Sequence, residues 1–224
     1  MSIATTTRPS SRASQALEDD RSEPGTTRRR PGAAARSVGS LALAGLVATL
    51  VLLGAKAAAA PSSLVPAGAP GRFPGWLAGP LHGLLGGHPG GGYQTQLLVI
   101  CACYAVVLAC ARSIGPRTLW AGIVLAHVAV LLGPPVLSAD VFGYLDFARL
   151  GVVHGLDPYT HTANAATGDA IYSYLGWHDV STPYGPLFTL FTYGLVPLGV
   201  AGGIWALKVI AVLTSLGAVA LVWR

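Results

Sequence analysis

The acidic residues that could do chemistry are confined to one stretch of this chain. Beyond position 23 every carboxylate belongs to an aspartate between positions 140 and 179: Asp140, Asp146, Asp157, Asp169 and Asp179. A positioned carboxylate can take the proton of an attacking hydroxyl, and a general base of this kind contributes about 10²–10⁴-fold to a rate. Arg149 is the only lysine or arginine in the same stretch, which makes it the candidate to meet negative charge on a leaving group.

The segment that begins at Asp140 is predicted to be a helix through Val153. On such a helix Asp140 and Tyr144 share one face (i, i+4), whereas Asp146 and Arg149 (i, i+3) would form a local ion pair on another. The large apolar side chains of the segment would hold it at a membrane interface. Asp140 also has a structural interpretation, because the side chain of Ser138 or Asp140 at the start of the helix can accept a hydrogen bond from a free N–H group and cap it.

Two proline-containing turns follow this predicted helix. Gly155-Leu-Asp-Pro-Tyr159 places Asp157 directly before a proline, which favours a turn. Pro183-Tyr-Gly-Pro186 is a second, rigid turn, and it carries Tyr184. Histidines accompany the aspartates in this stretch, namely His154, His161 and His178. Their spacing matches no metal-ligand pattern, so we predict no metal site.

The composition of the whole chain places these residues in a membrane protein. Charged residues make up 10% of the chain and apolar residues 52%, whereas roughly 25% of a soluble domain is charged. The net charge of +5 does not indicate nucleic-acid binding, since half of the basic residues lie in the first 36 positions and no basic stripe with interleaved aromatics follows. Such a basic segment is typical of the cytoplasmic flank of a membrane protein.

The chain divides into a disordered basic N-terminus, residues 1–36, and a partial transmembrane domain, residues 37–224. The predicted spans are 37–60, 97–111, 119–137, 186–200 and 204–223. If the basic N-terminus is cytoplasmic, the loop 138–185 that carries the aspartates is extracytoplasmic. Ala58-Ala-Ala60 also resembles a signal-peptide cleavage site, and a retained membrane anchor is the interpretation that we adopt.

The orientation of the last two hydrophobic segments stays open. A down-and-up hairpin would put Lys208 near the cytoplasm and Arg224 outside, whereas a re-entrant first segment would reverse the second. His127 lies in the middle of the third span, where it has either a function or a hydrogen bond to a neighbouring helix. Because the sequence stops at Arg224 directly after a hydrophobic segment, we expect it to be part of a longer protein and inactive alone.

Three motifs around the aspartates together resemble those of a known enzyme class. They are Asp-Val-Phe-Gly-Tyr at a span exit, Gly-Leu-Asp-Pro-Tyr, and Thr-Pro-Tyr-Gly-Pro-Leu before the next hydrophobic segment. They resemble the GT-C glycosyltransferases, in particular the actinobacterial polyprenyl-phosphate-mannose-dependent alpha-(1→6)-mannosyltransferases that build lipomannan. The resemblance covers roughly residues 93–224. It implies an all-α integral membrane bundle of the GT-C type, with an extracytoplasmic loop that bears interfacial helices.

By this resemblance the acidic residue of the early extracytoplasmic loop, here Asp140, is the catalytic one. We expect it to act as the general base in the transfer of a hexose with inversion of configuration. The donor is expected to be a polyprenyl phosphate that carries the hexose, which the resemblance implies is mannose, and the acceptor a glycolipid. The protein would also contact the surrounding membrane lipids. The residues expected to shape the substrate site are Tyr144, Arg149, Asp157, Tyr159 and Tyr184. No cofactor is expected, since the lipid-linked sugar is a substrate, and a requirement for a divalent metal stays open.

Non-catalytic membrane functions compete with this interpretation: a transporter, a scaffold, or a flippase for lipid-linked glycans. Transporters place ionisable groups and broken helices near the bilayer midplane. The carboxylates of this chain lie outside the predicted spans, which favours the enzyme.

Overall fold

The computed structural model describes residues 32–59, 74–84, 92–136 and 138–223. These residues form helices and turns and contain no strand, so the predicted all-α class is confirmed for the described part of the chain. Most of the predicted disordered N-terminus lies outside the described residues. Its last residues, 33–36, already belong to the first described helix, and the prediction is wrong for them.

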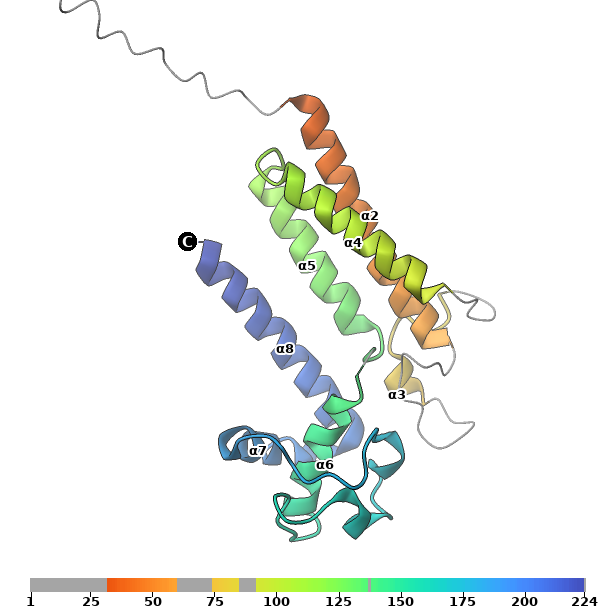
Figure 1. The fold of residues 1–224 in the computed structure, drawn as a ribbon, viewed down its shortest axis with the longest axis vertical. Helices are drawn as coiled ribbons and strands as arrows, with labels where there is room; N and C mark the ends of the chain where they lie inside the picture. The colour runs from red at the N-terminus through yellow and green to blue at the C-terminus, as the bar shows by residue number, and fades with distance from the viewer. Residues whose placement is uncertain (1–31, 60–73, 85–91, 137, 224) are drawn as a thin grey trace, which may run out of the picture.

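Four helices dominate the fold (Figure 1). They are α2 (Ala33–Ala59), α4 (Tyr93–Cys110), α5 (Pro116–Leu132) and α8 (Gly199–Trp223). Three segments are long and apolar enough to cross a membrane, namely α2, α4 and the stretch Pro186–Trp223 that ends in α8. α5 is a shorter apolar helix of 17 residues, about 25 Å at 1.5 Å per residue, and so falls a few ångströms short of a hydrocarbon core of about 30 Å.

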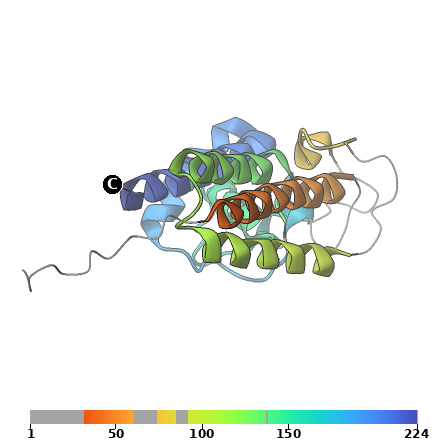
Figure 2. The ribbon, with the colours of Figure 1, turned by 90° about the horizontal axis from the view of Figure 1, so that it is seen from above.

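α2 packs against both α4 and α5, as Figure 2 shows from above. Glycines mark the closest approaches. A Cβ atom on Gly39 of α2 would lie 2.7 Å from the Cβ of Cys110 in α4, and one on Gly122 of α5 would lie 2.5 Å from the buried side chain of Leu43 in α2. Small residues at helix crossings let apolar helices approach closely enough for dispersion forces to hold them.

α8 runs antiparallel to α5, and side-chain contacts join the two helices at several levels. His127 of α5 donates from Nδ1 to the carbonyl oxygen of Ile123 (2.8 Å), which leaves Nε2 to accept a hydrogen bond from Ser215 Oγ of α8 (2.9 Å). Near the far end the rings of Trp120 and Trp223 lie 5.7 Å apart. The structure therefore gives His127 the hydrogen bond to a neighbouring helix that was one of its two predicted roles.

The shorter elements gather at one end of the long helices (Figure 1). They are α3 (Gly75–Ala78), α6 (Asp140–Val152), η2 (Ala163–Ala166), η3 (Tyr172–Tyr174), α7 (Pro186–Tyr193) and η4 (Val196–Leu198). One apolar core joins them to α8: Leu77, Phe142, Leu145, Ile171 and Ile204 are 2% exposed or less. The predicted helix from Asp140 is confirmed to within one residue of its predicted end.

Two predicted spans need correction. The segment 186–200 is not one helix, because α7 ends at Tyr193 and Gly199 adopts a φ of +70° after Pro197. An eight-residue helix of about 12 Å cannot cross a membrane, and α7 instead buries Thr189 and Thr192 where it packs on α6. The third predicted span, 119–137, also ends early, at Leu132, before Pro134 and Pro135.

This correction settles the direction of α8 within the fold. α8 starts at Gly199, earlier than predicted, at the end that holds α6, and runs back toward the start of α5, where Trp223 meets Trp120. Of the two arrangements that the sequence left open, the down-and-up hairpin does not form, and α8 has the direction that follows when the first segment does not cross. Lys208 consequently lies near the α6 end of the bundle, beside the carbonyl oxygen of Leu131.

Candidate functional site

Asp140 is the first residue of α6, and it follows the irregular stretch that leads out of α5. Its backbone N–H donates to Ser138 Oγ at 3.1 Å. The N-cap residue is Ala139, which has no side chain that could cap the helix, so Ser138 is the residue whose side chain accepts a free N–H group at the helix start. Within the described residues no hydrogen bond or ion pair engages the Asp140 carboxylate. The capping interpretation therefore fails for Asp140, and its half-buried carboxylate is available for other contacts.

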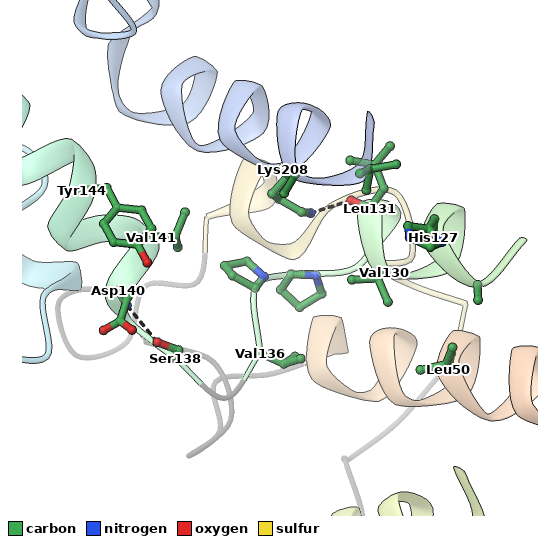
Figure 3. A pocket seen from close by; sticks show the side chains of 15 residues that line it. Leu50, His127, Val130, Leu131, Val136, Ser138, Asp140, Val141, Tyr144 and Lys208 are labelled. Carbon is green, nitrogen blue, oxygen red and sulfur yellow. Dashed lines mark hydrogen bonds between the residues drawn. The ribbon is translucent and has the colours of Figure 1, made fainter. Parts of the chain in front are cut away.

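A cavity of about 620 Å³ opens between the helices beside Asp140 (Figure 3). Most of its lining is apolar, from α2, α5, α8 and the residues that lead into α6, as exemplified by Leu50, Val130 and Val212. Its polar groups lie on two sides: Ser138, Asp140 and Tyr144 on one, His127 and Lys208 on the other. A cavity of this size and character suits an apolar ligand that carries a small polar group.

A second, smaller cavity of about 270 Å³ lies on the other side of Asp140. α6 lines one wall, and the loop 175–184 lines the other. Asp146 lies on the α6 wall, and the loop wall carries Tyr184 and an exposed indole, Trp177, whose exposed fraction is 65%. Asp140 thus belongs to the walls of both cavities, at the boundary between an apolar space among the helices and a more polar space under the loop.

Tyr144 and Tyr184 each share a cavity wall with Asp140, and Phe188 packs against both rings. Tyr144 meets Tyr184 edge to face at 4.8 Å and Phe188 at 5.0 Å, a geometry that rings favour because of their quadrupoles. Burial raises the pKa of Tyr184 to about 12, and the neighbouring Tyr144 and Asp140 act in the same direction. Tyr184 therefore keeps its proton near neutral pH and can serve as a hydrogen-bond donor but not as a base. The structure brings the predicted residues Asp140, Tyr144 and Tyr184 together.

The predicted ion pair between Asp146 and Arg149 does not form. Asp146 is 3% exposed and faces the smaller cavity. Burial, together with the charge of nearby Asp169, raises the pKa of Asp146 to about 6. The site thus holds a second carboxyl group that is hard to ionise, which the sequence did not reveal because it predicted an ion pair with Arg149 for Asp146.

Arg149 instead pairs with Asp169, a residue to which the sequence analysis assigned no role. The Arg149 Nε–Asp169 Oδ1 distance is 2.8 Å, and His154 Nε2 lies 2.7 Å from Asp169 Oδ2. The Ile171 N–H also donates to this carboxylate. Although burial opposes ionisation, these hydrogen bonds and the Arg149 charge lower the pKa of Asp169 to about 2. Arg149, about two and a half turns from Asp140 on α6, lies on the opposite face and lines none of these cavities.

Asp157 and Tyr159 belong to a separate part of the loop. Asp157 Oδ1 accepts the Tyr159 N–H at 3.0 Å, which confirms the predicted turn. Both residues line a third cavity, of about 430 Å³, with α7. The Tyr159 hydroxyl donates to the carbonyl oxygen of Tyr184 at 3.0 Å and lies 3.1 Å from Thr189 Oγ1. Tyr159 therefore braces the turn that carries Tyr184, and neither residue reaches Asp140.

Lys208 is the polar residue that sequence reasoning missed in the larger cavity. Its ammonium group donates to the carbonyl oxygens of Leu131 and Gly133 and lies 4.1 Å from the ring centre of Trp205. The available signal was a lysine inside an otherwise apolar segment, which marks a candidate functional group by itself. Among the described residues no three His, Cys, Asp or Glu side chains cluster as metal ligands would.

Fold and site together define a helical membrane protein with a polar, carboxylate-bearing site at one end of its helices. Residues 42–224 match the N-terminal domain of the alpha-(1→6)-mannopyranosyltransferase family, and the chain belongs to that family. A segment of 77 residues is 36% identical to a protein of Mycolicibacterium smegmatis named as a probable alpha-(1→6)-mannopyranosyltransferase. The match covers 32% of this chain and only 13% of that relative's length. No solved structure matches the chain.

Proposed function

We propose that this chain carries the catalytic loop of a mannosyltransferase that uses a polyprenyl-phosphate mannose donor and a glycolipid acceptor on the extracytoplasmic face of the membrane. The position of Asp140 on the walls of both cavities is the observation that supports this most. A polyprenyl chain suits the apolar cavity among the helices, and a sugar suits the smaller cavity with its carboxyl and aromatic groups. The reacting atoms would then meet at Asp140.

The proposed chemistry requires one base. The Asp140 carboxylate takes the proton of an acceptor hydroxyl, and the acceptor oxygen forms a bond to the anomeric carbon. The bond from that carbon to the phosphate oxygen breaks, so that polyprenyl phosphate leaves with the electron pair and the anomeric configuration inverts. Phosphate is already a competent leaving group, so general-base help of about 10²–10⁴-fold on the acceptor side is the main contribution asked of a side chain.

The aromatic cluster supports this assignment of roles. Tyr144 and Tyr184 stand beside Asp140 with their rings in contact, and the raised pKa of Tyr184 keeps it a hydrogen-bond donor. We assign both to the positioning of the sugar. Asp157 and Tyr159 support the loop from a distance, and Arg149 is committed to Asp169, so none of the three is proposed to touch the substrate.

The test is transfer of labelled mannose into lipoglycan by membranes of cells that carry the full-length gene. Asp140→Asn keeps the size of the side chain but removes the base, and we expect activity to fall by about 10²–10⁴-fold at equal expression. Asp179→Asn, which changes an exposed aspartate of the same loop, is the matched control and should leave activity unchanged.

Two outcomes would overturn the proposal. Full activity of Asp140→Asn would remove Asp140 as the base. Movement of the lipid-linked sugar across the membrane, without any glycosidic product from the wild-type protein, would replace the transferase by a flippase.

A further inference from the structure

Lys208 presents an unusual charge at the wall of the larger cavity. It stands in α8, Gly199–Trp223, where it is the one charged residue. A lysine near the centre of a membrane helix costs about 2.5–3.5 kcal/mol on insertion scales. Its two carbonyl partners, Leu131 and Gly133, and the ring of Trp205 are all neutral groups. The ion pairs of the described residues involve Asp169 alone, so no carboxylate there neutralises Lys208.

Helix capping explains the hydrogen bonds of Lys208 but not its positive charge. By donating to the last carbonyl groups of α5, the ammonium group caps the C-terminus of that helix, where a cation is favoured. A neutral donor would satisfy the same carbonyl groups at lower cost in lipid. The charge itself therefore calls for an anion, and the cavity that Lys208 lines is the place where one can approach it.

The apolar walls of the larger cavity favour an anion that is attached to a hydrocarbon chain. The cavity walls are mostly apolar and lie among helices that are apolar enough to sit in lipid, so a soluble anion would have to be desolvated to enter. An anion at the end of a hydrocarbon chain enters with its chain buried in the apolar walls. Asp140, Ser138 and Tyr144 line the opposite side of the same cavity, as Figure 3 shows.

We infer that Lys208 binds the phosphate of a polyprenyl-phosphate lipid in the larger cavity, with the hydrocarbon chain along its apolar walls. The inference rests on the proposed function for the identity of the lipid, and it places the cation for the leaving phosphate on α8 in place of Arg149. An ammonium group has three N–H donors, and two of them are directed at Leu131 and Gly133. Binding of phosphate there would also stabilise the charge that the leaving group gains during transfer.

The experiment measures binding, not transfer. The purified chain in detergent micelles is titrated with a polyprenyl monophosphate, with the corresponding polyprenol, with phosphatidylglycerol and with inorganic phosphate, and the shift in thermal unfolding is followed. We expect the polyprenyl monophosphate to bind more tightly than the alcohol. We also expect Lys208→Gln to weaken phosphate-lipid binding by roughly 10- to 100-fold, because a charge-assisted hydrogen bond is lost, and to leave binding of the alcohol unchanged.

The controls separate binding from stability. Gln keeps N–H donors for the carbonyl groups of α5, and Lys208→Arg keeps the charge and should retain most of the preference for phosphate. Lys56→Met removes the other lysine of the chain, near the end of α2, and should change nothing. If Lys208→Gln does not fold, a polyprenyl phosphate with a photoreactive group next to the phosphate should label α8 of the wild-type protein, and the polyprenol should not compete with it.

Equal affinity of wild type and Lys208→Gln for the phosphate lipid would overturn the inference, as would labelling confined to other segments. A preference for phosphatidylglycerol or inorganic phosphate over the polyprenyl lipid would also overturn it. These results are independent of the mannose-transfer test. A wild-type protein that binds polyprenyl phosphate through Lys208 but transfers no sugar would keep the inference and reject the transferase.

Discussion

At the scale of single residues, two carboxyl groups of α6 differ because of their surroundings. Asp140 is half-buried at the start of the helix, on the walls of both cavities. Asp146 is buried in the smaller cavity, where desolvation raises its pKa to about 6. A base must be ionised to accept a proton, so the less buried carboxylate is better suited to that role, and the buried one suits hydrogen bonds with a sugar.

Asp169 provides a residue-scale test with a defined dependence on pH. Its native pKa of about 2 lies below the unfolded value of 3.8, so its ionised form stabilises the folded state above about pH 4. That contribution is lost as the pH falls toward 2, because protonation removes the attraction to Arg149. We expect Asp169→Asn to lower the free energy of unfolding at pH 7 by about 2–4 kcal/mol, since it also leaves Arg149 buried without its partner.

The measurement is chemical unfolding in micelles at pH 7 and at a series of acidic values. The gap between wild type and Asp169→Asn should narrow toward pH 2, because about half of the Asp169 side chains in the folded state are protonated there. Asp179→Asn, in the same loop but exposed, should differ from wild type by less than about 0.5 kcal/mol. A gap that stays constant from pH 7 to pH 2 would show that Asp169 acts through packing and not through its charge.

At the scale of elements, the short helix α3 contacts both α8 and the end of α5. The indole N–H of Trp205 donates to the carbonyl oxygen of Trp76 in α3 at 2.9 Å, and the Trp205 ring in turn lies against the Lys208 ammonium group. Gly79 ends α3 with a φ of +72°, and a Cβ atom there would lie 2.5 Å from the carbonyl oxygen of Leu132. α3 is therefore fixed against the end of α5 by a backbone contact.

We expect Gly79→Ala to lower the free energy of unfolding by more than the strain that an alanine has at a positive φ. Gly83 is a matched control because its φ is +81° but a Cβ atom there would meet nothing within 4 Å. Gly83→Ala should cost about 1–2 kcal/mol from conformation alone. Gly79→Ala should cost about 1–3 kcal/mol more, because the backbone of α5 has to move. Thermal unfolding in micelles compares the two, and equal losses would show that α3 does not rest on α5.

The helices illustrate what the sequence could and could not predict. α2, α4 and α6 were predicted because apolar length and a clear start at Asp140 are local properties. α7 was mistaken for part of a span, because apolar residues that pack on α6 have the same composition as residues that face lipid. The pairing of Arg149 with Asp169 was missed for a similar reason: Asp146 offered a local partner, and the true one lies 20 residues away.

At the scale of the whole molecule, two arginines and the aspartates lie at opposite ends of the long helices. Arg112 lies in the link between α4 and α5 and Arg117 in the first turn of α5, whereas α6 and the aspartate loop lie at the other end of the helices (Figure 1). The Asp140 half of the site was predictable, because the aspartates form one stretch of sequence. The position of Lys208 in the same cavity was not predictable, because it depends on the direction of α8, and the distribution of basic residues did not determine that direction.

This arrangement predicts the sidedness of the protein in the membrane. Arginine-rich links stay cytoplasmic, so the loop that contains Ser173 should face outward and the link that precedes α5 should face inward. In a variant that lacks the three native cysteines, Ser173→Cys should react with a membrane-impermeant maleimide on intact cells. Thr118→Cys, at the exposed start of α5, should react only after the membrane is permeabilised. Labelling of Thr118→Cys on intact cells with protection of Ser173→Cys would place Asp140 in the cytoplasm, where an extracytoplasmic transfer reaction could not use it.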